Sequence, residues 1–99
     1  MEVRDLDLSA KDLGILQSIL NQYFPDAQAW AYGSRVTGKA RPGSDLDVVV
    51  LVPRASPAFY EMREALVESD ISVRVDLFVW GEIPGQFQEQ IKEAFFILQ

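Results

Sequence analysis

Two carboxylates and a pair of small residues lie close together in the middle of the chain. Asp45 and Asp47 stand two residues apart where the apolar run 48–52 begins, and ten residues separate them from Gly33-Ser34. Since alternate residues of a strand leave the same face, both carboxylates can approach one cation. Glycine lets a phosphate approach the backbone closely, and the next amides and the serine hydroxyl can donate to it. The pattern predicts a site for phosphate and metal.

The ligand types available in this chain narrow the choice of metal. Two carboxylates about 4 Å apart repel by ~4 kcal/mol at an effective dielectric constant of 20, which favours a cation between them. The chain has no histidine and no cysteine. Oxygen ligands alone point to Mg²⁺, with Mn²⁺ as the alternative. Arg35, Lys39 and Arg41 are near enough in sequence to offset phosphate charge, although loop cations often serve solubility alone.

A third carboxylate, Asp76, is flanked by Val75 and Leu77 in an otherwise apolar segment. If its strand lies beside the strand of Asp45 and Asp47 and parallel to it, the three carboxylates form one cluster. Each signal has a plainer reading, because a lone Asp-x-Asp is a solvated turn in roughly nine cases of ten. A Gly-Ser pair alone is weaker evidence still. Gly33-Ser34, Asp45 with Asp47, and Asp76 are all expected at one place in the fold, and this joint position favours a single site.

Hydrophobic spacing predicts three helices and three strands. Ser9 is an expected helix N-cap with Asp12 completing a capping pattern, and Ser56 followed by Pro57 reads as a second helix start. The β-branched run after Asp47 is typical of a central strand covered on both faces. We expect helices over residues 10–23, 57–69 and 86–98, and strands over residues 27–32, 45–52 and 73–80.

These elements predict an α+β fold, similar to α/β proteins, with a small mixed sheet of about three strands flanked by helices. The second and third strands are joined through a helix, so they should run parallel with a right-handed crossover. The first and second are joined by the site loop, with one turn of helix after Ser34, which favours an antiparallel pair. We expect a single domain over residues 1–99.

Composition limits the classes of function. The chain has 99 residues, is 48% hydrophobic and 24% charged, and carries a formal net charge of −6. An acidic chain disfavours sequence-independent binding to nucleic acid. The absence of cysteine excludes disulfides and thiolate chemistry, and no apolar run is long enough for a membrane span. We expect a soluble, cytoplasmic protein.

Taken together, Gly33-Ser34, the ten-residue spacing, Asp45-Leu46-Asp47 and the later Asp76 resemble the signature of the DNA polymerase beta-like nucleotidyltransferase superfamily. The small size resembles its minimal nucleotidyltransferase (MNT) branch, whose members are antitoxin-like partners of HEPN-domain proteins in prokaryotes. The resemblance covers nearly the whole chain, and the motif is specific when all three carboxylates are present.

The resemblance implies two-metal transfer of a nucleoside monophosphate, AMP from ATP, to a tyrosine of a HEPN toxin, which silences its RNase activity. Two Mg²⁺ ions would be bound by the carboxylates, and Asp76 would also help activate the attacking hydroxyl. Residues are assigned as follows: catalytic and metal-binding, Asp45, Asp47 and Asp76; nucleotide-binding, Gly33, Ser34, Arg35 and Ser44.

Other functions stay open at this point. A non-catalytic antitoxin could neutralise a HEPN partner by binding alone, although the intact triad favours an enzyme. Transfer to a small molecule such as an aminoglycoside is a weaker alternative, because the chain shows no acceptor-binding domain. The acceptor, the nucleotide and the roles of Lys39 and Arg41 are not assigned.

The apolar end of the chain, residues 94–98, is expected to contact a partner or a second copy, since it is apolar on more than one helical face. The alternative is that this segment packs entirely into the core. Larger relatives carry a second domain, so missing walls of the site would come from another chain or stay open.

Overall fold

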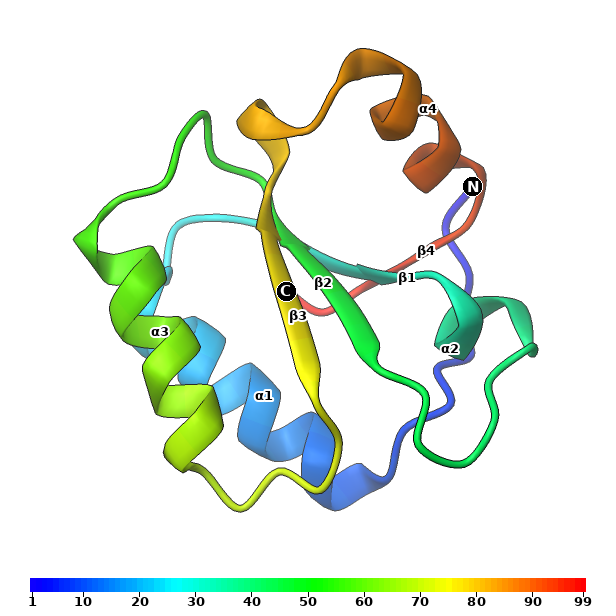
Figure 1. The fold of residues 1–99 in the computed structure, drawn as a ribbon, viewed down its shortest axis with the longest axis horizontal. Helices are drawn as coiled ribbons and strands as arrows, with labels where there is room; N and C mark the ends of the chain where they lie inside the picture. Colours follow the sequence, from blue (N-terminus) through cyan, green and yellow to red (C-terminus); the bar gives the residue numbers. More distant parts are fainter.

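The structure, a computed structural model, describes all of residues 1–99 and consists of one sheet between helices (Figure 1). It confirms the expected α+β class and adds a fourth strand. The elements are α1 (Ala10–Tyr23), β1 (Ala29–Tyr32), α2 (Ser34–Thr37), β2 (Leu46–Val50), α3 (Pro57–Glu68), β3 (Val75–Val79), the 3₁₀ helix η1 (Trp80–Glu82), α4 (Gly85–Glu93) and β4 (Phe95–Ile97).

The sheet is mixed, with the strand order β3-β2-β1-β4. β2 and β3 run parallel and are joined through α3, as the helical connection predicts. β1 runs antiparallel to β2 and to β4. β2 therefore has a neighbour on each side, which confirms its central position.

The main core lies between one face of the sheet and the helices α1 and α3, which share one side of the molecule in Figure 1. Alternate residues of each strand point into this core, because successive side chains leave opposite faces. The core includes Leu16, Leu20, Val48, Val50, Phe59, Met62, Leu66, Leu77 and Val79.

None of the helices combines the length and the apolar character that a membrane crossing needs.

Both helix starts expected from the sequence are present. Ser9 caps α1, and its hydroxyl accepts a hydrogen bond from the Asp12 N–H. Ser56 precedes α3 and Pro57 occupies its first turn, although the Ser56 side chain makes no capping hydrogen bond. A first-turn proline is tolerated because its missing N–H would have no partner within the helix.

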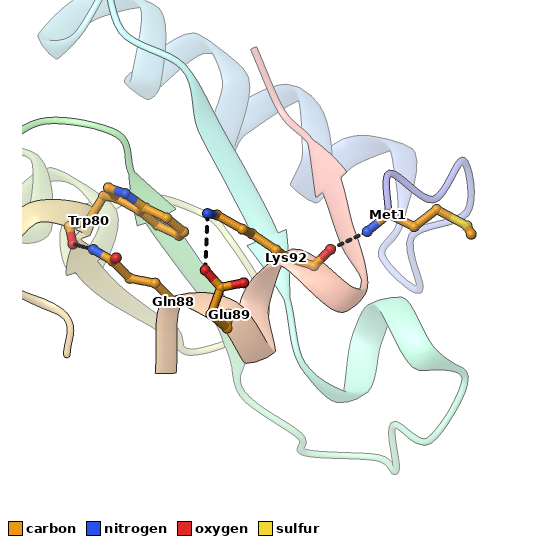
Figure 2. Close-up of polar contacts among 5 residues, drawn as sticks. All are labelled: Met1, Trp80, Gln88, Glu89 and Lys92. Carbon is orange, nitrogen blue, oxygen red and sulfur yellow. Dashed lines mark hydrogen bonds and ion pairs between the residues drawn. The ribbon is translucent and has the colours of Figure 1, made fainter. Parts of the chain in front are cut away.

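The opposite face of the sheet is covered by α4. Ile91 of α4 packs against Tyr32 and Val49 in a small second cluster. Figure 2 shows two hydrogen bonds that hold this helix in place. The Gln88 side-chain amide donates to the Trp80 carbonyl at 2.8 Å, and the N-terminal amine of Met1 donates to the Lys92 carbonyl. Lys92 and Glu89 add an exposed ion pair on the helix surface. α4 is thus held at its middle, through Gln88, and near its C-terminal end, through Lys92, over the face that carries Tyr32.

The expected last helix over residues 86–98 is wrong in its second half. α4 ends at Glu93, Ala94 is extended, and β4 pairs with β1. Strand alternation explains why the segment is apolar on more than one helical face: Phe96 packs against the main core, whereas Ile97 is 37% exposed. The helical argument for a partner surface at residues 94–98 therefore does not hold.

Candidate active site

Asp47 and Asp76 are brought together by the pairing of β2 and β3. In the parallel register Asp47 lies opposite Asp76, and both side chains leave the face of the sheet away from α1 and α3. Asp45 lies just before β2, in phase with Asp47. The structure thus places the three predicted carboxylates around the adjacent starts of β2 and β3.

The charges in this group influence one another. Burial raises the pKa of the Asp47 carboxyl above its ordinary value, and the negative charges of Asp76 and Asp45 raise that pKa further. Arg74 offers partial relief, since its Nε lies 3.4 Å from Asp76 Oδ1, but its side chain is 76% exposed. A solvent-exposed pair of this kind is weak. The negative charges of the three carboxylates are therefore largely unneutralised.

Gly33 follows β1 and lies directly against the carboxylate of Asp47. Tyr32 pairs with Asp47 across β1 and β2, so the chain turns beside that side chain. Gly33 has a φ of +85°, and a Cβ at this position would lie 2.6 Å from Asp47 Oδ2. Only glycine fits this conformation and this contact. Ser34 then begins the short helix α2, so the predicted phosphate-binding pair and the carboxylates share one place.

Arg35 has a structural task that the sequence did not reveal. Its Nε and Nη2 donate to the carbonyl of Ser44 at 3.1 and 2.9 Å, and its Nη1 donates to the carbonyl of Asp7 at 2.7 Å. The guanidinium thus ties the start of the site to the loop that leads into β2. The assignment of Arg35 to the nucleotide stays a prediction, and this geometry adds a second role.

Ser44, Lys39 and Arg41 belong to the loop before β2 and make different contacts. The Ser44 hydroxyl accepts from the Arg41 N–H at 2.8 Å, and the Ser44 N–H donates to the Arg41 carbonyl, so both form a turn. The side chains of Lys39 and Arg41 are exposed and take part in no ion pair. The turn therefore uses the Ser44 hydroxyl, whose contact with nucleotide stays a prediction.

Two aromatic residues beside the carboxylates were missed from the sequence. Tyr32 pairs with Asp47 across β1 and β2 and lines the same cavity. Burial raises the pKa of its hydroxyl, and the negative charges of Asp47 and Asp76 raise that pKa further. Phe87 of α4 approaches Tyr32 edge-on with ring centroids 6.2 Å apart. The signal for Tyr32 was its place directly before Gly33. No local pattern ties Phe87 to the site, because α4 reaches it only through the fold.

Hollows lie on two sides of the carboxylates. The first, about 330 Å³, is lined by Gly33, Asp47, Tyr32 and residues of α4 that include Phe87 and Gln90. The second, about 630 Å³, lies between α3 and β3 and has Asp76 in its lining. Asp47 thus lines the cavity on the glycine side, and Asp76 lines the cavity at the edge of the sheet.

The donor set suits an oxygen-binding divalent cation, although the side chains are not arranged as a finished metal site. No group of three or more acidic side chains is gathered closely enough to hold an ion. The chemistry of the donors fits nevertheless: three carboxylates, no soft ligand, and unrelieved negative charge at Asp47. A cation there would lower the repulsion that now raises the pKa of Asp47.

Residues 13–98 match the family described as Nucleotidyltransferase domain. The chain belongs to this family. The domain is also 40% identical, over 96 residues, to the probable protein adenylyltransferase MntA of Haemophilus influenzae, a match that covers 95% of this chain and 84% of the relative. The resemblance drawn from Gly33-Ser34 and the three aspartates is therefore confirmed, and the domain is a nucleotidyltransferase.

Solved structures share the fold of this nucleotidyltransferase domain. A toxin–antitoxin complex with AMP-PNP superimposes with a TM-score of 0.72 at 20% identity, covering 88% of this chain and 72% of the other. The toxin–antitoxin MntA-HepT gives a TM-score of 0.67 at 17% identity, covering 92% and 72%. At these identities the likeness establishes the architecture alone.

Proposed function

We propose that this nucleotidyltransferase moves AMP from ATP to a tyrosine hydroxyl of a HEPN-domain toxin in the cytoplasm and so acts as its antitoxin. The observation that carries the proposal is the pairing of Asp47 with Asp76 beside Gly33. Two findings support the choice of a protein acceptor. The relative from Haemophilus influenzae is named a probable protein adenylyltransferase, and similar folds occur in toxin–antitoxin complexes.

The reaction assigns a task to each part of the site. The acceptor oxygen attacks the α-phosphorus of ATP, the bond from that phosphorus to the bridging oxygen breaks, and pyrophosphate leaves. Asp76 accepts the proton of the attacking hydroxyl. Gly33 and Ser34 hold the phosphates, and Arg35 keeps the loop before Asp45 in place through the Ser44 carbonyl. No water takes part, so the products are the adenylylated protein and pyrophosphate.

Magnesium is the cofactor that we propose, with two ions shared by Asp45, Asp47 and Asp76. When bound, Mg²⁺ stabilises negative charge on the entering and leaving oxygens. The carboxylates position it and are themselves relieved of mutual repulsion. Asp47 has the strongest case as a ligand, because its pKa is raised by burial and by both neighbours.

The deciding experiment follows a label from ATP to protein. The chain is incubated with ATP labelled at the α-phosphate, Mg²⁺ and the product of the neighbouring reading frame, and the same mixture is made with Asp45→Asn/Asp47→Asn. We expect label on the partner only with the wild-type chain. EDTA, which removes Mg²⁺, should abolish this labelling. Neutralisation of the partner's toxicity without label on either protein would instead identify a binding antitoxin, and label on an added aminoglycoside a small-molecule transferase.

A further inference from the structure

The two edges of the sheet differ in how their backbone groups are used. At the β4 edge the N-terminal segment supplies partners: the Val3 N–H donates to the Phe95 carbonyl at 2.7 Å, and the Phe95 N–H donates to the Met1 carbonyl at 3.1 Å. Covering an edge in this way prevents pairing with another chain. The chain thus closes this edge at Phe95.

The β3 edge is left open. The Leu46 N–H donates to the Arg74 carbonyl, so alternate residues from Arg74 through Asp76 direct their backbone groups toward β2. Val75 and Leu77 alternate with these residues and direct their N–H and C=O groups away from β2. No backbone bond outside the ladders uses the groups of Val75 or Leu77. Such a row of unpaired groups is a template for an extended chain.

A groove runs beside this edge. The cavity of about 630 Å³ lies between β3, α3 and the loop that joins them, and its walls include Leu66, Val67 and Ile71. The charged residues of its lining are Arg63, Arg74 and Asp76. Arg63 lies over the rings of Phe59 and Tyr60, with its Cζ 5.4 and 5.2 Å from their centroids. The groove is therefore positive in a chain whose net charge is −6. This charge suits an acidic segment.

One of the proposed catalytic carboxylates, Asp76, lies within this open edge, between Val75 and Leu77. Asp76 lies in β3 and lines this groove, whereas Gly33 and Asp47 line the smaller cavity on the other side. Since phosphates need the glycine side, the acceptor has the β3 side left for its approach. On a strand added to β3, the residue opposite Asp76 leaves the same face with its Cβ about 5 Å away.

We propose that an extended, acidic segment of the acceptor protein pairs with the β3 edge as an added strand and brings its hydroxyl to Asp76. The backbone groups of Val75 and Leu77 supply the pairing, a mode known from other edge strands. Arg63 and Arg74 attract the acidic side chains of the segment. The proposal rests on the proposed function and adds the route by which the acceptor enters.

Charge changes inside and outside the groove test the proposal. Val67 is 81% exposed and the Arg63 side chain is also exposed, so Val67→Glu and Arg63→Glu should fold normally. Arg54→Glu makes the matched charge change at an exposed position outside the groove. With the labelled-ATP assay, we expect KM for the acceptor to rise about tenfold in the two groove variants only. Arg63→Glu loses a charge-assisted contact, and Val67→Glu adds a charge that repels the acidic segment. ATP affinity, measured by fluorescent-ATP titration, should not change.

The backbone pairing has its own test. Val75→Pro removes an N–H that faces away from β2, a place where an edge strand tolerates proline, and Val75→Thr keeps that N–H. We expect slow transfer with proline and normal transfer with threonine, after circular dichroism shows both folded. A benzophenone side chain at Val67 should crosslink to the acceptor segment that becomes labelled, and this measurement decides if the proline variant does not fold.

The outcomes separate the two proposals. Transfer by the wild-type chain that none of the groove or edge variants slows would overturn the docking proposal and leave the proposed function standing. A crosslink outside the labelled segment would do the same. A wild-type chain that labels nothing would overturn the proposed function, and the docking proposal with it.

Discussion

Asp47 on β2 and Asp76 on β3 are opposite each other in adjacent parallel strands, with both carboxylates on one face of the sheet. Like charges in directly opposed positions destabilise a sheet. Burial raises the pKa of the Asp47 carboxyl, and the repulsion from Asp76 raises that pKa further. The fold therefore carries an electrostatic cost at its candidate active site.

Removing one of these charges should separate stability from activity. We expect Asp47→Asn to raise the free energy of unfolding by about 0.5–1 kcal/mol in urea without divalent cations, because one repelling charge is gone. Label transfer should fall by about 100-fold or more, since charge stabilisation of the transition state is lost. Glu61→Gln removes an equal charge from an exposed site on α3 and should change neither. A destabilised Asp47→Asn would show that the carboxylates do not strain the fold.

Two glycines allow a matched test of the phosphate-binding turn. Gly33 and Gly38 both have positive φ, of +85° and +78°, but only at Gly33 would a Cβ meet a neighbour, Asp47 Oδ2. We expect Gly38→Ala to cost about 1 kcal/mol of stability from backbone strain alone. Gly33→Ala should cost about 2–3 kcal/mol, because its ψ of −153° lies in a region reserved for glycine.

The two alanine variants should differ more in activity than in stability. At Gly33 the new Cβ displaces the Asp47 carboxylate, so label transfer is expected to disappear while Gly38→Ala keeps it. Thermal unfolding and the labelled-ATP assay measure both effects. Equal activity of the two variants would mean that the contact between Gly33 and Asp47 has no part in the reaction.

Much of the site was predictable because it depends on local rules. Strand alternation places Asp45 with Asp47, and the helical connection makes β2 and β3 parallel, which is enough to bring Asp76 alongside. Connection length also places Gly33. A short loop makes β1 antiparallel to β2, so the end of β1, which Gly33 follows, lies next to the start of β2. These relations need only the spacing of apolar residues and the length of the connections.

The remainder depends on partners that are distant in sequence. Residues 95–97 form a strand because β1 and the N-terminal segment offer them hydrogen bonds, and an apolar run alone does not distinguish this strand from a helix. Arg35 looks like any cation near a phosphate site. Its actual acceptors, the carbonyls of Asp7 and Ser44, carry no sequence signature.

Arg35 can be tested for a positioning role against a nucleotide contact. Lysine keeps the charge but lacks the forked donors, so Arg35→Lys should lose the bonds to Asp7 and Ser44. If it positions the loop, stability falls by about 1–2 kcal/mol and kcat drops while KM for ATP is unchanged. A raised KM for ATP with normal stability would identify a direct nucleotide contact. Arg41→Lys, at an exposed position of the same loop, should behave as wild type.

Asp12 is the one buried polar or charged residue, with 2% of its surface exposed. It accepts hydrogen bonds from the Ser72 N–H, at 3.0 Å, and from the Ser72 hydroxyl. These bonds join the first turn of α1 to the loop before β3. The hydrogen bonds from Ser72 lower the pKa of the Asp12 carboxyl below its ordinary value. The carboxylate therefore stabilises the fold through a contact outside the active site.

We expect Asp12→Asn to lower the free energy of unfolding by about 1–3 kcal/mol at neutral pH, because an amide cannot accept both bonds in the same way. A carboxyl with a lowered pKa in the folded state stabilises above its unfolded pKa, and this contribution is lost as the pH falls through the folded value. The difference between wild type and Asp12→Asn should thus be constant near neutrality and shrink below about pH 4. Urea unfolding across this range measures it, and Ser72→Ala should remove most of the same pH dependence. A difference that persists unchanged in acid would show that packing, rather than the ionised carboxylate, accounts for the loss.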